Sequence, residues 1–293
     1  MRVRVFMLLL FPLLAVGAYA DSLALGSAGT YAVLGATGVT NSGVTTINGG
    51  NVGSYSNPAL TGDTLCAPSV ANCYAFTGGG IATATATNQT DLSTAITSLN
   101  GLPSFPLSSS GFSAGNLTFL PGVYSAVSNF ELTGALTLNA EGLPNVDFIF
   151  LVGSLTADVG SSVNLIHPGT NDGVYWVVGS SATLDGATFV GNVLAHTSIT
   201  MGSDVTITCG SALANTGDVT LIGDTITTGC NSIYTSSTTG GPTGTGGGLV
   251  TTSGGTTTPP PGIAPVPEPG AWLLLGSIIA VLAAQRRWAR AKV

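Results

Sequence analysis

The stretch that decides the fold is Val174–Thr227, which reads VYWVVGSSATLDGATFVGNVLAHTSITMGSDVTITCGSALANTGDVTLIGDTIT. Short runs rich in Val, Ile and Thr alternate in it with Gly, Ser and Asp. Thr183, Thr200 and Thr220 recur at spacings of 17 and 20 residues. A period of about 20 residues, made of short strands and tight corners, is typical of a solenoid whose coils stack on one another. The sequence therefore predicts a mainly β fold of stacked coils.

One segment departs from this pattern. Between Ile81 and Asn100, apolar residues recur near helical spacing, and Gly101 and Pro103 follow. This periodicity predicts one long α-helix over about 81–100. The run Asp147–Val152 is apolar almost throughout, as expected for a strand that is covered on both faces. We therefore expect the helix to pack alongside the solenoid over this strand.

Charge is distributed very unevenly along the chain. The chain has six basic residues, and all lie at its ends, so that no Lys or Arg occurs between Asp21 and Gln285. The 13 acidic residues all lie within that span, and the formal net charge is −7. A body without cations cannot neutralise phosphates, so nucleic-acid binding is excluded.

The first 20 residues resemble a secretory signal peptide. Arg2 and Arg4 precede an apolar run, and Ala18-Tyr19-Ala20 fits the small-x-small cleavage rule. We expect the mature chain to begin near Asp21 and to be exported.

The C-terminal part has two segments. Residues 236–265 are rich in Thr, Gly, Ser and Pro, and predict a linker that cannot bury a core. In residues 266–293, Pro267, Glu268 and Pro269 precede a short apolar run and a basic end. This order resembles the PEP-CTERM sorting signal of Gram-negative bacteria. The resemblance implies an exosortase-type processing enzyme as a partner, transient membrane anchoring through this transmembrane segment, and release or attachment at the cell surface.

A set of ordered segments spans the body, roughly Leu23–Cys230. They are Leu25–Gly29 with Tyr31–Leu34, Leu120–Ser125, Leu136–Leu138 leading to Phe148–Phe150, Gly160–Leu165, Val174–Leu184 and Thr197–Thr200. In these segments the body resembles the microbial ice-binding protein family. The resemblance implies a right-handed parallel β-solenoid with discontinuous coils, one long α-helix packed alongside, and an ice crystal surface as the partner. The expected domain covers residues 21–235.

An enzyme is not expected. A glycosidase needs two carboxylates on facing positions, whereas several Asp residues here lie beside Gly, where Asp favours corners. The body offers no Lys or Arg as a base. His167 and His196 stand alone, without Cys, His or Glu at metal-ligand spacing. We therefore predict neither a metal nor a cofactor.

The chain contains four cysteines. Cys66 and Cys73 close a short loop, and Cys209 and Cys230 are one coil apart. Stacked coils are about 4.8 Å apart, which is compatible with a disulfide. For an exported chain we therefore predict the pairs Cys66–Cys73 and Cys209–Cys230.

Threonine rows are the candidate binding surface. Ile207 and Ile226 each stand between two threonines, and alternation along a strand points each Ile inward and its neighbours outward. The predicted face consists of Asn164, Thr188, Val190, Thr206, Thr208, Thr225 and Thr227. A second candidate row, on another face, consists of Thr183, Thr200 and Thr220. Threonine is also simply favoured on exposed strands, which is the alternative explanation for both rows.

A stiff, regular grid of threonine methyls and hydroxyls can order water in an ice-like arrangement. We therefore predict an exported ice-binding protein of the antifreeze type, which adsorbs to ice and inhibits its growth or recrystallisation. The alternative is a structural protein for adhesion in a surface or biofilm matrix, with exopolysaccharide as its partner. Ice binding demands a flat face without bulky or charged interruptions, and adhesion does not.

Overall fold

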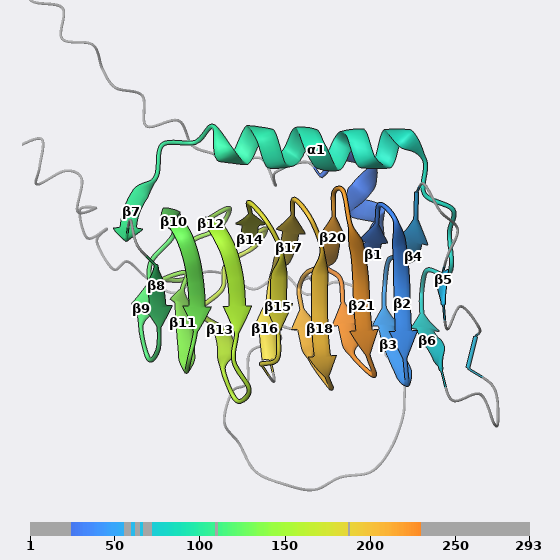
Figure 1. Cartoon of the computed structure of the whole chain (residues 1–293). Helices are drawn as coiled ribbons and strands as arrows, with labels where there is room; N and C mark the ends of the chain where they lie inside the picture. The colour runs from blue at the N-terminus through green and yellow to red at the C-terminus, as the bar shows by residue number, and fades with distance from the viewer. Residues whose placement is uncertain are drawn as a thin grey trace, which may run out of the picture. The chain divides into compact units, whose positions relative to one another are not determined.

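The computed structural model describes residues 25–55, 60–61, 65–66, 72–108, 111–186 and 188–229. These residues form a parallel β-solenoid with an α-helix along one side (Figure 1). Each coil contributes strands to three surfaces, which we name the helix-side strip, the front strip and the third strip. The predicted signal peptide, the linker and the sorting segment lie outside the described residues. No helix in the described part is long and apolar enough to cross a membrane.

The helix-side strip and the front strip belong to one sheet, in which two long strands run through both. The helix-side strip consists of β4 (Asn51–Ser54), β1 (Tyr31–Gly35), β20 (Ala212–Ala214), β17 (Asn192–Ala195), β14 (Gly173–Val178), the first parts of β12 (Asp147–Ala157) and β10 (Gly122–Leu132), and β7 (Phe105–Ser108). The front strip consists of β5 (Leu60–Thr61), β2 (Gly38–Ser42), β21 (Asp218–Ile222), β18 (Ile199–Ser203), β15 (Ala182–Leu184), the last parts of β12 and β10, and β8 (Phe112–Ala114).

The third strip is a sheet of its own with eight strands. It consists of β6 (Cys73–Thr77), β3 (Val44–Asn48), β22 (Thr225–Thr227), β19 (Thr206–Thr208), β16 (Thr188–Val190), β13 (Ser162–Ile166), β11 (Ala135–Asn139) and β9 (Thr118–Phe119).

The order of the coils in space differs from their order in the chain. The coil β1–β3 pairs with the last coil, β20–β22, through Val33↔Ala212, Thr40↔Thr220 and Ile47↔Ile226. Figure 1 shows this as blue strands beside orange ones. The coil β4–β6 lies beyond β1–β3 and ends the stack on that side. The solenoid is therefore discontinuous, as the family resemblance implied.

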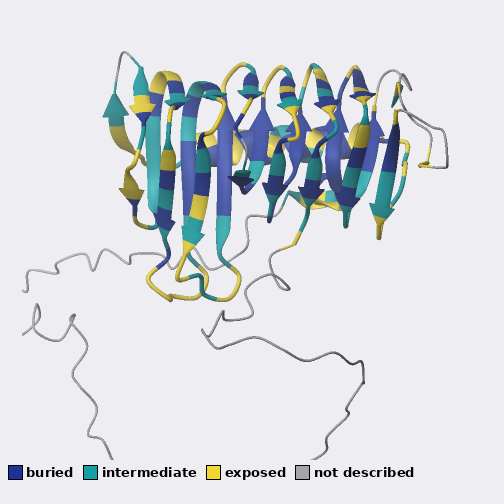
Figure 2. Ribbon diagram, turned by 90° about the horizontal axis from the view of Figure 1, so that it is seen from below, coloured by how far each residue is buried: buried dark blue, intermediate teal, exposed yellow. Residues whose placement is uncertain are grey.

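The interior core follows from strand alternation. Buried and outward residues alternate along most strands of the front and third strips, as in β18, where Ile199 and Met201 are buried and Thr200 is exposed. Aromatic side chains fill the core between β8, β9, β10, β12 and β14, and Phe150 and Trp176 stack there with ring centroids 4.2 Å apart. The Trp176 Nε1 donates to the Val190 carbonyl over 3.0 Å. Figure 2 shows exposed residues on the outer surfaces and turns, and buried residues along the strands.

The α-helix α1 covers Ala86–Asn100 and is shorter than the predicted 81–100. Residue Thr85 is extended, and its backbone N–H donates to Asn88 Oδ1 over 2.7 Å, which starts the helix there. The preceding Ile81 forms a β-bridge with Val52, so Ala82 and Ala84, expected in the helix, lie before it. The periodicity of these alanines does not outweigh the bridge.

The helix packs on the helix-side strip, as predicted. Its residues Leu92, Ile96 and Leu99 form a second apolar cluster with strand residues that point away from the interior. These strand residues include Leu34, Ile149, Tyr175, Val177, Leu194 and Leu213. Asp91 ties the helix to the 3-10 helix η1 (Gly26–Thr30), because its Oδ2 accepts from the Ser27 N–H at 2.8 Å and the Ser27 hydroxyl at 2.6 Å. The helix-side strip is thus covered, and the front and third strips carry the candidate rows.

Candidate functional site

The front strip carries a continuous ladder of threonines. Adjacent strands pair Thr61 with Thr40, Thr40 with Thr220, Thr220 with Thr200, Thr200 with Thr183, and Thr183 with Thr156. Six threonines therefore occupy one register position on six neighbouring strands. At a strand spacing of about 4.8 Å, the row is roughly 24 Å long. We call this row, which contains the second candidate row of the sequence, the threonine ladder.

The side chains of the ladder are available to solvent. Thr40, Thr61 and Thr200 are exposed, and Thr156, Thr183 and Thr220 are half-buried. The residues on either side of each of the five threonines from Thr40 to Thr156 are buried, so the backbone beneath them is anchored in the core. Within the described residues, none of these five hydroxyls makes a hydrogen bond to protein. The ladder is therefore a rigid row whose hydroxyls are left for water.

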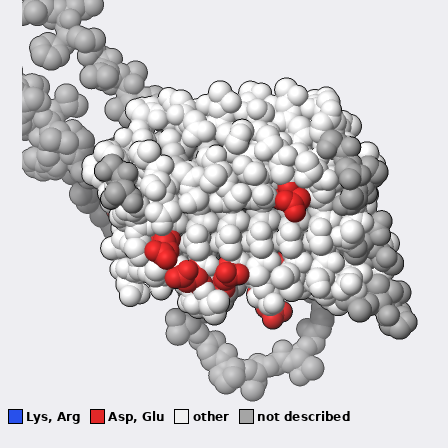
Figure 3. All heavy atoms as spheres, in the orientation of Figure 1, with Lys and Arg blue, Asp and Glu red and all other residues white. Residues whose placement is uncertain are grey.

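Charge on the front strip lies on β10 and at the ends of the other strands, and one carboxylate comes close to the ladder: the exposed Asp218 is the first residue of β21, two residues before Thr220. Glu131 pairs with Thr156 and so ends the ladder on the β10 side, while Asp158, Asp185 and Asp204 follow the ends of β12, β15 and β18. Figure 3 shows this face in the orientation of Figure 1, with most acidic atoms along one rim and one separate acidic group within the otherwise uncharged field. The flanking positions Ser181 and Ser198 place their hydroxyl oxygens 3.4 Å apart.

The third strip carries the row that the sequence put first. Thr188 pairs with Thr206, and Thr206 pairs with Thr225, which in turn pairs with Thr46. Ile207 and Ile226 are fully buried, and Thr206, Thr208, Thr225 and Thr227 are half-buried on the outside, so the predicted alternation is confirmed. Asn164 is exposed on β13, where its Nδ2 donates to the Ser162 hydroxyl over 3.1 Å.

The second position of the third strip is less regular than expected. We predicted that Val190 extends this face, but it is only 5% exposed and packs in the interior core. It follows buried Phe189, and Gly191, with φ 105°, then turns the chain. Val190 is the register partner of Thr208, whose hydroxyl donates to the Phe189 carbonyl over 3.4 Å. The Thr227 hydroxyl accepts from Asn48 Nδ2 over 3.1 Å.

Sequence reasoning missed Thr40, Thr61 and Thr156 as members of the ladder. Thr37-Gly38-Val39-Thr40 has the same form as Thr197-Ser198-Ile199-Thr200, and Gly153-Ser154-Leu155-Thr156 is similar. This signal was present in the chain. What it does not reveal is that β2 pairs with β21 although some 180 residues separate them, which is a property of the discontinuous fold.

Titratable groups form no metal cluster among the described residues. Burial raises the pKa of Asp224 to about 6, although its carboxylate accepts from the Val205 and Ile222 backbone N–H groups over 2.9 and 2.8 Å. Burial and the nearby Asp172 raise the pKa of Asp147 to about 6. His167 Nδ1 lies 3.0 Å from Asn139 Oδ1. Asp147, Asp172 and Asp224 each lie at a corner between strips, where their carboxylates accept from backbone N–H groups.

One predicted disulfide is confirmed. Cys66 and Cys73 are joined with their Cα atoms 5.0 Å apart, and they close the loop before β6. Cys209 is buried next to β19. Its predicted partner, Cys230, lies outside the described residues, so that pairing stays a prediction.

Comparisons with known proteins agree with this geometry. A family model described as ice-binding-like matches residues 33–227. An ice-binding protein of Nostoc sp. (strain HG1) is 39% identical over 208 residues, which cover 70% of this chain and 74% of the Nostoc protein.

Solved structures give the same result. The ice-binding protein of the Antarctic ascomycete Antarctomyces psychrotrophicus is 30% identical, with a TM-score of 0.58, and the match covers 69% of this chain and 96% of that protein. An ice-binding protein from an Antarctic biological consortium is 29% identical, with a TM-score of 0.57, over 70% of this chain and 90% of that one. The family model covers most of the solenoid and the Nostoc relative aligns over most of its own length, so this chain belongs to the ice-binding-like family.

Proposed function

We propose that this protein binds ice through the threonine ladder of the front strip. The observation that carries the proposal is the shared register of six threonines on six adjacent strands. Each threonine presents a methyl and a hydroxyl on a stiff side chain. Repeated at about 4.8 Å, these groups offer water a periodic set of apolar and polar contacts. Waters held in that pattern can merge with a growing ice lattice and stop its advance.

The front strip is a better candidate than the third strip for two reasons. Its row is longer, with six threonines in register against four at the first position of the third strip, and Val190 leaves a gap at the second position of the third strip. Its hydroxyls are also uncommitted within the described residues, whereas Thr208 and Thr227 already have hydrogen-bond partners in the protein. A hydroxyl that bonds to its own chain has less capacity to position water. We therefore assign the contact surface to the second candidate row, extended by Thr40, Thr61 and Thr156.

The test of the function is to measure thermal hysteresis and ice recrystallisation inhibition with the purified protein. We expect faceted crystals, a measurable freezing-point gap and persistent small grains in annealed ice. A protein of similar size and charge from outside the family is the control for colligative effects. Ice binding would be contradicted if, in both assays, ice crystals grow in the same way with this protein as with the control protein.

We further propose that the protein acts without catalysis and is exported. The body contains no Lys or Arg to serve as a base or to bind an anionic substrate. Residues 1–20 direct export, and the Pro267–Pro269 motif directs processing by an exosortase-type enzyme at the envelope of a Gram-negative cell. The intact mass of the protein recovered outside the cells tests both cleavages. A recovered chain that retains both ends would contradict them.

A surface location also supports the second candidate function, adhesion in a matrix with exopolysaccharide. The sorting segment is the observation that favours it. Protein that sediments with washed exopolysaccharide would support adhesion, and protein that stays in the supernatant would contradict it.

A further inference from the structure

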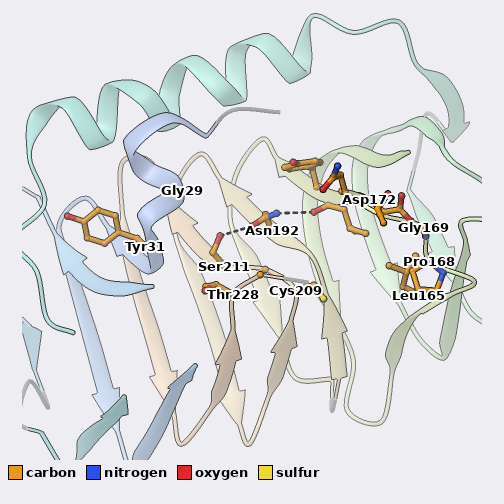
Figure 4. A pocket seen from close by; sticks show the side chains of 17 residues that line it. Gly29, Tyr31, Leu165, Pro168, Gly169, Asp172, Asn192, Cys209, Ser211 and Thr228 are labelled. Atoms are coloured by element: carbon orange, nitrogen blue, oxygen red, sulfur yellow. Dashed lines mark hydrogen bonds between the residues drawn. The ribbon is translucent and has the colours of Figure 1, made fainter. Parts of the chain in front are cut away.

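A groove lies away from the threonine ladder, at the corner where the third strip meets the helix-side strip, and it borders the ends of β19 and β22. Its volume is about 380 Å³, which is in the range of small-molecule sites. It crosses adjacent coils, from Gly29 beside β1, past Ser211 and Asn192, to the loop Pro168–Asp172 (Figure 4). None of the ladder threonines lines it. A groove that runs across coils suits an extended chain better than a compact ligand.

The floor of the groove is polar. Asn192 lies in its middle, half-buried, and its Oδ1 accepts from the Ser211 hydroxyl over 2.9 Å. Its Nδ2 reaches the Val174 carbonyl only at 3.4 Å. A carboxamide has two N–H donors and two acceptor lone pairs. Asn192 therefore keeps one donor and one acceptor site for a ligand, and Ser211 fixes the orientation of its amide.

One wall of the groove carries an acceptor. The half-buried Asp172 carboxylate accepts from the Gly169 N–H over 2.6 Å and from the Val146 N–H over 3.3 Å. A carboxylate has about four acceptor positions, so two remain. The two backbone bonds hold the loop 168–172 and aim the carboxylate, so the acceptor is in place before a ligand arrives.

The charge of the chain narrows the ligand class. No Lys or Arg occurs in the solenoid, and Asp172 places a negative charge in the groove wall. Phosphates, sulfates and uronic acids would be repelled and would find no cation. A neutral molecule with many hydroxyl groups can donate to Asp172 and can both donate to and accept from Asn192. We propose that this groove binds a segment of neutral polysaccharide.

This proposal does not depend on ice binding, because it uses a different surface. It would give the matrix partner considered above a defined site. Both a free oligosaccharide and a matrix polymer carry the same chemistry, and they differ only in length.

The test is a binding titration of the purified full chain by calorimetry. The probes are neutral tetrasaccharides from dextran, starch and cellulose, an anionic oligogalacturonate, and a dextran polymer. We expect at least one neutral tetrasaccharide to bind and the anionic probe not to bind. A dextran polymer that binds more tightly than the tetrasaccharide would identify a long matrix chain as the natural source, and equal affinities would identify the free oligosaccharide.

Two groove variants and one control locate the site. Asn192→Ala and the milder Asp172→Asn should each weaken binding about ten-fold, as expected for a lost hydrogen bond in a partly buried site. Thr220→Val removes a hydroxyl on the front strip and should leave sugar affinity unchanged. Three outcomes would each overturn the proposal: no neutral probe binds at millimolar concentration, both groove variants bind with the affinity of the parent, or the anionic probe binds more tightly than the neutral ones. Ice recrystallisation in Asn192→Ala reports separately on the ladder and should match the parent.

Discussion

The front strip and the third strip are two surfaces of the same coils, and both present threonine, yet they differ in what the threonines do. On the front strip, Thr200 and its partners stand between buried neighbours, and their side-chain hydroxyls make no hydrogen bond within the described residues. On the third strip, Thr208 and Thr227 bond to nearby groups. Threonine content alone therefore does not identify a binding face. We propose that the register and the hydrogen bonding of the hydroxyls, at the second position of the third strip in particular, distinguish the surface that binds ice from one that stabilises its own sheet.

The largest effect should come from a bulky residue in the middle of the ladder. Thr200→Tyr would raise an aromatic ring above the exposed centre of the row and hold the neighbouring threonines away from ice. We expect it to remove most of the thermal hysteresis with little change in the free energy of unfolding, because Thr200 is exposed.

The matched control for this change is Thr206→Tyr, on the same coil but on the third strip. It should keep most of the parental activity. If the losses are reversed, so that Thr206→Tyr is inactive and Thr200→Tyr is active, the contact surface is the third strip.

The second-largest effect on ice activity should come from a substitution in the core, and its size should depend on the strip beneath which the residue lies. Ile199 and Ile207 lie on one coil, both are fully buried, and each lies next to a threonine of its strip. Replacing either by Ala should cost about 3 kcal/mol of unfolding free energy, measured by urea denaturation, because a cavity remains. At a temperature where both variants are folded, only Ile199→Ala should lose ice activity, since it loosens the backbone under Thr200. Equal activity losses in the two variants would mean that general rigidity, rather than the front strip, controls binding.

Much of this comparison could be predicted from sequence, and the rest had a physical obstacle. The alternation around Ile207 and Ile226 is local, so the sequence correctly predicted that these two side chains point inward and that the threonines beside them point outward. The prediction that Val190 lies on the outer face was wrong, because strand alternation fails where Phe189 and Val190 are both buried before the turn at Gly191. The ladder was recognised only in its contiguous part. Its extension to Thr40 depends on the pairing of β2 with β21, and a strand pairing between distant segments leaves no local pattern.

A smaller effect is expected at the corner that joins the two strips. Asp224 lies between β21 and β22, is fully buried, and has a pKa raised to about 6 by burial. A group whose folded pKa is above its unfolded value stabilises the fold at low pH and loses that contribution as the pH rises through the folded value. The free energy of unfolding should therefore fall by about 2 kcal/mol between pH 4.5 and 7.5 on account of Asp224.

Urea denaturation at several pH values measures this slope. Asp147, whose pKa is also raised to about 6, contributes in the same direction, so Asp224→Asn should flatten the slope without removing it. The amide can accept from only one of the two backbone N–H groups, so this variant should also be less stable than the parent at pH 4.5. A parent whose stability rises from pH 4.5 to 7.5 would contradict the assignment.

The smallest effect should come from a single hydroxyl on the third strip. Thr208→Val keeps the shape of the side chain and removes the donor to the Phe189 carbonyl, a long bond of 3.4 Å on a half-buried residue. The free energy of unfolding should fall by about 0.5 kcal/mol, the low end for a hydrogen bond, and thermal hysteresis should stay at the parental value. Thr200→Val on the same coil is the matched variant, and it has no protein hydrogen bond to lose within the described residues. It should leave stability unchanged and reduce hysteresis. If Thr208→Val lowers hysteresis as much as Thr200→Val does, then hydroxyls already bonded within the protein still contribute to binding, and the distinction between the two strips is wrong.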